Sequence, residues 1–248
     1  MREIGFEAFL SCSALSDLEF GDKLETIGQG AFQYCESLRS IKMPSVRTVQ
    51  AWAFKLCVQL TDIEFGIDLE RIGCHSFYSC RSLQRIAIPL KENLFTFDSA
   101  QRRYTQFENC KNLTTVDIVG AEEINNTVSS LLLERWKDEM NEVIGRINRE
   151  LPGALADEKS NAIQQWIRSV INGVEHYKAE HNRLLKEHMT QLELAVWKAK
   201  LDERNENSTQ KVQAKRAKID EESAREEDRI VSGADIIIKN VLPFLKLQ

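Results

Sequence analysis

Apolar side chains recur with a fixed spacing over the first 120 residues of the chain. A phenylalanine stands three residues before a cysteine, and a leucine follows three residues after it, at five places: Phe9-Cys12-Leu15, Phe32-Cys35-Leu38, Phe54-Cys57-Leu60, Phe77-Cys80-Leu83 and Phe107-Cys110-Leu113. A fixed period with fixed apolar offsets is typical of a solenoid, in which each repeat is one coil that buries its apolar side against its neighbours.

Each leucine is followed by a short alternation of apolar and polar residues. The apolar positions are Leu18 and Phe20, Ile41 and Met43, Ile63 and Phe65, Ile86 and Ile88, and Val116 and Ile118. This alternation predicts one short strand per coil, with the apolar side chains inward. The outward positions are then Asp17 and Glu19, Ser40 and Lys42, Asp62 and Glu64, Arg85 and Ala87, and Thr115 and Asp117.

The complete repeat reads C-x-x-L-x-x-I-x-I/F, then a variable turn, then I-G-x-x-A-F-x-x-C, and it resembles the BspA-like leucine-rich repeat family over residues 1 to about 120. The resemblance implies a parallel sheet along one face of an arc, the A-F turn on the other side, and a role in binding or adhesion. We expect about five coils, the first incomplete because the chain opens half-way through a repeat.

One repeat is longer than the others, with an insertion between Lys91 and Tyr104. It contains two phenylalanines, two arginines and a tyrosine: Phe95, Phe97, Arg102, Arg103 and Tyr104. Aromatic and arginine side chains dominate interface hot spots, which makes Arg102, Arg103 and Tyr104 candidate partner-binding residues. The alternative is that Phe95 and Phe97 replace the missing aliphatic-glycine positions and pack inward.

The outward face of the predicted sheet is the second candidate surface. Its charged members are Asp17, Glu19, Lys42, Asp62, Glu64, Arg85 and Asp117. Because strands lie about 4.8 Å apart, Glu19, Lys42 and Glu64 should stand side by side, where opposite charges contribute roughly 0.2 to 1 kcal/mol per pair. The face is therefore either a self-neutralising charge ladder or a polar surface that binds a protein partner.

The cysteines and histidines do not form a recognisable reactive site. Zinc ligands come in pairs two to five residues apart, whereas the five repeated cysteines are 22 to 30 residues apart, so we expect buried thiols bonded to turn backbone. Cys74 lies outside that column, with His75 as its only nearby activating group. No nucleotide-binding, nucleophile-elbow or metalloprotease motif is present, so we expect no catalytic residue, no cofactor, no metal and no enzymatic activity.

Beyond Gly120 the repeat gives way to helical spacing. We expect a linker or first cap at residues 121–127, and helices at about 128–151, 154–204 and 210–242, with a break at 205–209. The long helix has two apolar stripes displaced by one residue: Ile163, Ile167, Val170, Val174, Tyr177, His181 and Leu184, then Leu185, Met189, Leu192, Val196 and Ala199. This predicts an antiparallel three-segment bundle with the long helix as its spine; the alternative is a homodimeric coiled coil through the same stripe. The segment around Gln191–Leu201 resembles helical extensions of BspA-like repeat proteins predicted from unicellular algae.

The fold class expected is thus α+β: a leucine-rich-repeat solenoid with short parallel strands at residues 1–120, then an all-α bundle or coiled-coil region at 121–248. We expect a non-enzymatic protein-interaction module or scaffold; the alternative is a fragment of an adhesin-like surface or secreted protein.

The charge and hydropathy of the chain exclude some classes of partner. The net charge is -5, from 33 basic and 38 acidic side chains spread along the chain, which disfavours nucleic acid, and no apolar run is long enough for a membrane span. Lys215 to Lys218 fits a short nuclear-import pattern, although an acidic run follows and a mixed-charge helix surface is the simpler interpretation. We therefore expect a cytoplasmic or nuclear location, or a secreted or surface one if coils precede Met1.

Overall fold

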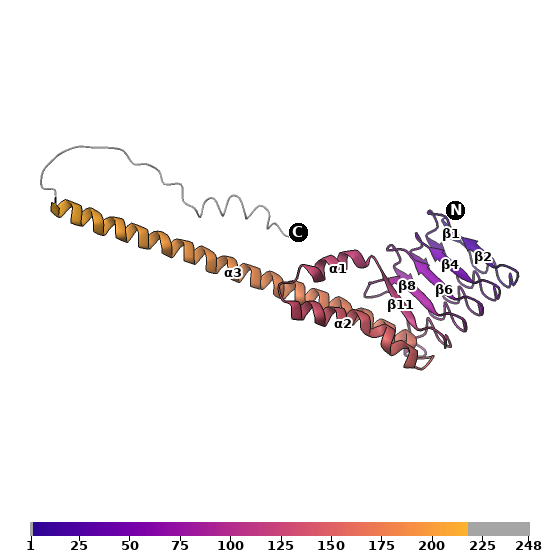
Figure 1. Ribbon diagram of the computed structural model, residues 1–248. Helices are drawn as coiled ribbons and strands as arrows, with labels where there is room; N and C mark the ends of the chain where they lie inside the picture. Colours follow the sequence, from indigo (N-terminus) through magenta and orange to yellow (C-terminus); the bar gives the residue numbers. More distant parts are fainter. Residues whose placement is uncertain (1, 218–248) are drawn as a thin grey trace. The chain divides into compact units, whose positions relative to one another are not determined.

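The computed structural model describes residues 2–217 (Figure 1). Contacts divide the chain into two compact units, Met1–Ala179 and Glu180–Gln248. The first unit contains every repeat together with the helices that follow directly. The first compact unit therefore extends 59 residues beyond residue 120, where the sequence pattern changes.

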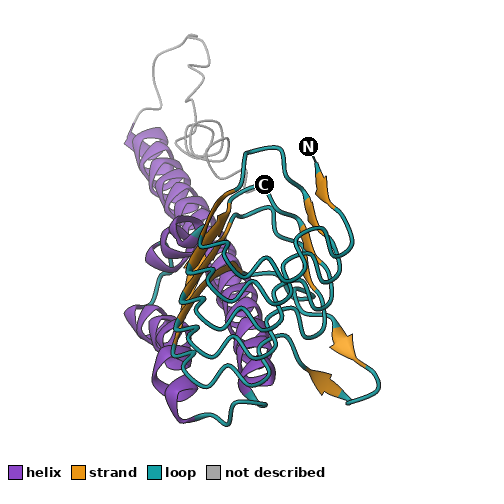
Figure 2. Cartoon of the chain, turned by 90° about the vertical axis from the view of Figure 1, so that its right-hand side faces the viewer, coloured by secondary structure: helices purple, strands orange, loops and turns teal. Residues whose placement is uncertain are grey.

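The main sheet confirms the predicted coils. Its strands are β2 (Asp17–Glu19), β4 (Ser40–Met43), β6 (Asp62–Phe65), β8 (Arg85–Pro89) and β11 (Thr115–Val119), all parallel and in the order β11-β8-β6-β4-β2. The register aligns one repeat column across the sheet, because Ile41 pairs with Ile63, and Ile63 pairs with Ile86. Figure 2 shows the coils stacked, with the main sheet on one side and loops with short strands on the other.

A second parallel sheet is formed by the aliphatic-glycine positions, which the sequence analysis did not recognise as strands. Its members are two residues long: β1 (Glu3–Ile4), β3 (Thr26–Ile27), β5 (Thr48–Val49) and β7 (Arg71–Ile72). Phe95 continues this sheet through a single parallel bridge to Ile72 and is buried, so the prediction that it replaces the aliphatic position is confirmed.

Phe97 does not pack inward as that interpretation expected, because it leaves the coil in an antiparallel ribbon. This ribbon pairs β9 (Phe97–Asp98) with β10 (Arg103–Tyr104). The Phe97 side chain is 49% exposed and rests edge-on against Tyr104, with ring centroids 5.3 Å apart. The insertion therefore supplies one core residue and one exposed hairpin.

The core is a stack of phenylalanine rings, one from each coil. The rings of Phe9, Phe32, Phe54, Phe77 and Phe107 lie nearly parallel, with successive centroids 5.0, 5.2, 5.3 and 5.4 Å apart. Contacts of this kind add about 0.5 to 1.5 kcal/mol per pair beyond the burial of apolar area. The fixed position of phenylalanine in each repeat thus places the rings of successive coils in one continuous stack.

The helical region contains α1 (Ala121–Ser129), α2 (Glu134–Glu150), a 3₁₀ turn (Leu151–Gly153) and α3 (Lys159–Ala217). The linker expected at residues 121–127 is wrong, because this segment is helix α1. It has neither proline nor glycine, and its first turn contains Glu122 and Glu123, whose charges favour a helix N-terminus.

The other helix boundaries also differ from the prediction. The first expected helix, at 128–151, is split: Val128 lies buried in the last turn of α1, which ends at Ser129, and α2 begins only at Glu134. The break expected at Asn205–Thr209 is absent, because asparagine, serine and threonine lower helix propensity by less than about 0.7 kcal/mol each and remove no backbone donor. The helix expected at 210–242 lies within α3 up to Ala217 and otherwise outside the described residues.

Within the first unit, α2 packs along the first apolar stripe of α3, as the bundle prediction required. Ile163, Ile167 and Val170 are fully buried, and the Trp166 indole donates a hydrogen bond to the Val143 carbonyl at 3.0 Å. Gly173 lies opposite Met140, where a Cβ atom would come within 2.8 Å of the sulfur. The two helices therefore approach closely and belong to one core with the repeats.

Candidate interaction surface

Side chains of α2 and α3 close the last coil by replacing the hydrogen bonds of a further repeat. In each earlier coil the phenylalanine N–H donates to a carbonyl of the next coil; Phe54, for example, donates to Ser76 O at 2.7 Å. The last phenylalanine, Phe107, instead donates to the hydroxyl oxygen of Ser160 at 2.8 Å. Ser160 is 1% exposed and lies in the first turn of α3.

Two more side chains complete this cap. Asn148 of α2 pairs with the edge strand β11, accepting from the Val116 N–H at 2.7 Å and donating to the Val116 carbonyl at 3.2 Å. Lys159 is buried, and its ammonium donates to the carbonyls of Lys111 and Leu113. Loss of hydration lowers the pKa of Lys159. The C-terminal end of the solenoid is thus covered. The outward face of the main sheet is exposed at Asp17, Glu19, Ser40 and Lys42, whereas the predicted outward residue Ala87 is buried.

The repeated cysteines are structural, as predicted. Four of them are buried, and each thiol donates to the carbonyl of the phenylalanine one coil earlier, at 3.0 to 3.2 Å: Cys35 to Phe9, Cys57 to Phe32, Cys80 to Phe54 and Cys110 to Phe77. Burial raises the pKa of Cys35 to about 11 and that of Cys57 further. Cys12, in the first described coil, is exposed.

Cys74 and His75 do not form an activated pair. The Cys74 sulfur donates to the Thr96 carbonyl at 3.6 Å, and burial raises the pKa of this thiol, which reduces its thiolate fraction. His75 is buried and stacks on Trp52 with ring centroids 4.3 Å apart, and its Nε2 lies 3.1 Å from a carboxylate oxygen of Glu108. Both residues therefore serve the packing of the insertion.

Two of the three candidate residues in the insertion contact other segments of the same chain. Arg103 forms ion pairs with Asp157 at 3.0 Å and Glu108 at 3.1 Å. The Tyr104 N–H donates to the side chain of Asn161 at 3.0 Å, and its hydroxyl accepts a hydrogen bond from Arg168. Only Arg102 remains exposed. Tyr104 thus holds the hairpin to α3, and Arg103 holds it to the turn before α3 and to the last repeat, so the two residues are not a free aromatic-arginine hot spot.

The strand face lies where the sequence placed it, and its charges are partly paired. Lys42 forms an ion pair with Glu64 at 3.2 Å, and Arg85 pairs diagonally with Asp117 at 2.6 Å. The predicted row is formed, because Glu19 aligns with Lys42, and Lys42 aligns with Glu64. Within residues 2–206, whose side chains are described, Asp17, Glu19 and Asp62 have no ion pair. The face therefore retains an excess of negative charge.

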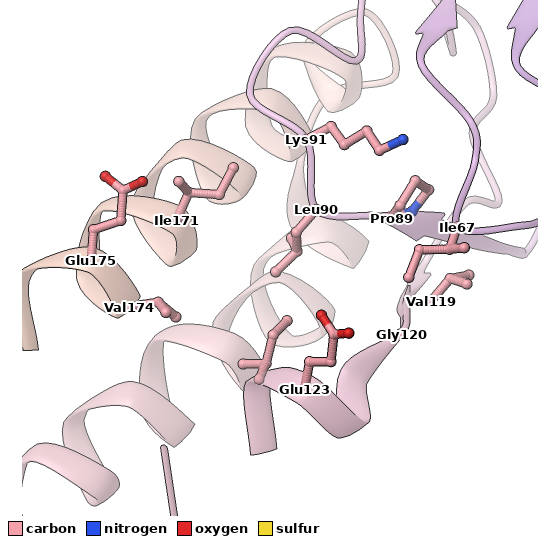
Figure 3. Close-up of a pocket in the computed structure, with 11 residues that line it drawn as sticks. Ile67, Pro89, Leu90, Lys91, Val119, Gly120, Glu123, Ile171, Val174 and Glu175 are labelled. Carbon is pink, nitrogen blue, oxygen red and sulfur yellow. The ribbon is translucent and has the colours of Figure 1, made fainter. Parts of the chain in front are cut away.

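A pocket opens at the carboxyl ends of β8 and β11, between α1 and α3 (Figure 3). Its volume is about 350 Å³. Its apolar lining is Ile67, Pro89, Leu90, Val119, Ile124, Ile171 and Val174, and Lys91, Glu123 and Glu175 are its charged members. Val119 and Pro89 continue the alternation of outward residues in β11 and β8, so the pocket adjoins the strand face.

Sequence reasoning missed this pocket because its walls come from four separate segments of the chain. One wall is α1, in a segment that the sequence analysis took as a linker. The available signal in the sequence was the presence of apolar residues at the ends of two strands: Ile67 after β6, and Pro89-Leu90 at the end of β8.

Searches for other site types give negative results over the described part of the chain. No helix there is both long and apolar enough to cross a membrane. Among the same residues, no group of three or more His, Cys, Asp or Glu side chains is placed to hold a metal ion.

Three solved structures are similar to this chain. A leucine rich repeat protein of T. pallidum is 28% identical with a TM-score of 0.39, and the match covers 46% of this chain and 62% of that one. A leucine-rich repeat protein from Bacteroides ovatus is 24% identical with a TM-score of 0.32, covering 48% and 43%. A leucine rich cell surface protein from Faecalibacterium prausnitzii is 23% identical with a TM-score of 0.30, covering 45% and 34%. The chain thus matches less than two thirds of the length of each.

Comparison with curated proteins gives no match. The family model of the BspA type leucine rich repeat region matches residues 2–130 in 6 copies, one more than the five coils expected. The matched segment spans every strand of the solenoid and α1, and it covers more than half of the sequence. With its period, parallel sheet and matched repeats in agreement, the chain belongs to the BspA-type leucine-rich-repeat family.

Proposed function

We propose that this chain is a non-enzymatic protein-interaction module that binds its partner with the strand face and the adjoining pocket. The observation that supports this most directly is the meeting of an accessible acidic surface and an apolar cavity on the same side of the sheet. Leucine-rich repeats generally serve as interaction or surface-protein modules, which agrees with this proposal.

The chemistry of the surface indicates a segment with one bulky apolar side chain next to lysine or arginine. Burial of such a side chain in the pocket contributes about 1.5 to 3 kcal/mol, which is typical of an interface anchor. Glu123 and Glu175 line the pocket with exposed side chains. A cation beside the anchor would meet these carboxylates, whereas the same charges repel nucleic acid.

The test is selection of peptides from a random displayed library on the full-length chain, followed by affinity measurements with the selected peptides. We expect enrichment of an aliphatic or aromatic residue flanked by Lys or Arg. Glu123→Lys should weaken binding of these peptides about tenfold, because it replaces an attractive charge by a repulsive one. Val174→Phe should weaken it as well, because the larger side chain occupies the pocket.

Glu122→Lys is the matched control, because Glu122 has the same charge, helix and exposure as Glu123 and does not line the pocket. Binding by this variant should equal that of the unmodified chain. Selected peptides without basic residues, or equal losses for the two lysine variants, would contradict the proposed surface.

A further inference from the structure

The part of α3 in the second unit has an apolar stripe that no described side chain covers. We call its members the second seam: Leu185, Met189, Leu192, Val196 and Ala199. Their spacing of four, three, four and three residues places them on one side of the helix, as in a coiled coil. Leu192 is 53% exposed, and none of the five belongs to the hydrophobic core around the repeats.

Two charged residues that flank the second seam, Lys186 and Glu193, have no ion-pair partner within the described residues. Arg183 of the same helix, by contrast, pairs with Glu180 at 3.0 Å and with Glu187 at 3.3 Å. Lys186 and Glu193 are seven residues apart, or about 10.5 Å along the helix axis, and this is too far for them to pair with each other. Opposite charges thus stand on the same flank of an exposed apolar seam, two turns apart.

We propose that the second seam binds a second copy of this chain in antiparallel orientation. In this register Met189 of one copy packs against Leu192 of the other, and Leu185 packs against Val196. Lys186 of each copy then lies beside Glu193 of the other, and the twofold symmetry forms this ion pair twice. In the parallel orientation, Glu193 would face His188 of the other copy, and Lys186 would face His181. No pair between a lysine and a carboxylate would then form.

The length of the second seam limits the affinity of the dimer. Fifteen residues span about 21 Å, which supplies four apolar layers in the antiparallel register. Two heptads of isolated peptide would be marginal, but here the helix is already formed within a longer α3. The dimer is therefore reversible and its population depends on protein concentration.

Sedimentation equilibrium of the full-length chain over a concentration series tests this proposal. The unmodified chain should dimerise, and Leu192→Glu should be monomeric. Lys186→Glu and Glu193→Lys should each weaken dimerisation about tenfold, because each turns two attractive contacts into repulsive ones. The double variant Lys186→Glu/Glu193→Lys should return to within about threefold of the original affinity.

Lys198→Glu is the control, because it makes the same charge change on the opposite side of the helix from the second seam and should leave dimerisation unchanged. A monomeric full-length chain whose thermal stability falls with Leu192→Glu would overturn the proposal, since the seam would then be covered within one chain. A dimer that the double variant fails to restore would refute the antiparallel register.

Discussion

Replacement of Ser160 by alanine isolates the contribution of the helical cap to the repeat fold. The Ser160 hydroxyl accepts a hydrogen bond from the Phe107 N–H at 2.8 Å in a buried position. Alanine removes this acceptor and leaves only a small void in its place. A buried donor without a partner costs about 1 to 3 kcal/mol. Alanine also has the higher helix propensity, which returns about 0.5 kcal/mol.

The expected net loss for Ser160→Ala is therefore about 0.5 to 2.5 kcal/mol in the free energy of unfolding of the first unit. Urea unfolding followed by circular dichroism measures it, with the midpoint shift converted through the slope of the transition. In a thermal scan the same loss lowers the Tm by about 2 to 4 °C per kcal/mol for a unit of this size.

Ser169→Ala is the matched control for this measurement. Ser169 lies in the same helix and gains the same propensity, but its hydroxyl accepts only from Arg146 at 3.2 Å at a partly exposed site. Its free energy of unfolding should change by no more than about 0.5 kcal/mol. If Ser160→Ala and Ser169→Ala unfold at the same urea concentration, the reasoning that Ser160 replaces a repeat carbonyl is refuted.

Two further predictions concern the repeats themselves. In the native chain at neutral pH, iodoacetamide should modify Cys12 quickly and the buried thiols slowly, because burial shields the sulfur atoms and raises the pKa of Cys35. Mass spectrometry of the peptides measures the rates, and fast labelling of the buried thiols would contradict the prediction that the repeated cysteines are buried. Gly66→Ala should destabilise the solenoid by at least about 1 to 3 kcal/mol, because the new Cβ would lie 1.7 Å from the Pro44 carbonyl oxygen. Gly21 occupies the same repeat position with no atom within 4 Å, so Gly21→Ala should change the urea midpoint little, and equal effects of the two substitutions would count against the close approach of coils.

The repeat half could be predicted from the sequence because its contacts recur. Phenylalanine, cysteine and strand positions obey one rule in every coil, so a single period fixes the strands, the register and the buried thiols together. The second sheet was missed because a strand of two residues, such as Thr48–Val49, is too short to show alternation. Phe97 was misplaced because its position depends on the pairing of β9 with β10, which has no counterpart in the other repeats.

The cap and the pocket could not be predicted, because their members are ordinary residues of surface helices in the sequence. Nothing in the local pattern separates Ser160 or Asn148 from the exposed serine and asparagine residues nearby. Their roles depend on the packing of α2 and α3 against the last coil, where the N–H and carbonyl groups that lack a further repeat bond to these side chains. The pocket likewise depends on α1, which brings Glu123 and Ile124 to the ends of the strands.

Because the helical cap stabilises the repeats, a truncated chain cannot show which half of the protein binds the partner. Removal of residues 121–248 would strip Ser160, Asn148 and Lys159 from the last coil and expose apolar side chains of that coil, such as Val116, to water. At about 1.5 to 3 kcal/mol for each large apolar side chain that loses its burial, the loss approaches the total stability of an ordinary domain. A repeat fragment that fails to bind would therefore report on unfolding. Single charge changes at Glu122 and Glu123 keep the cap intact, and they separate recognition by the pocket from the stability of the solenoid.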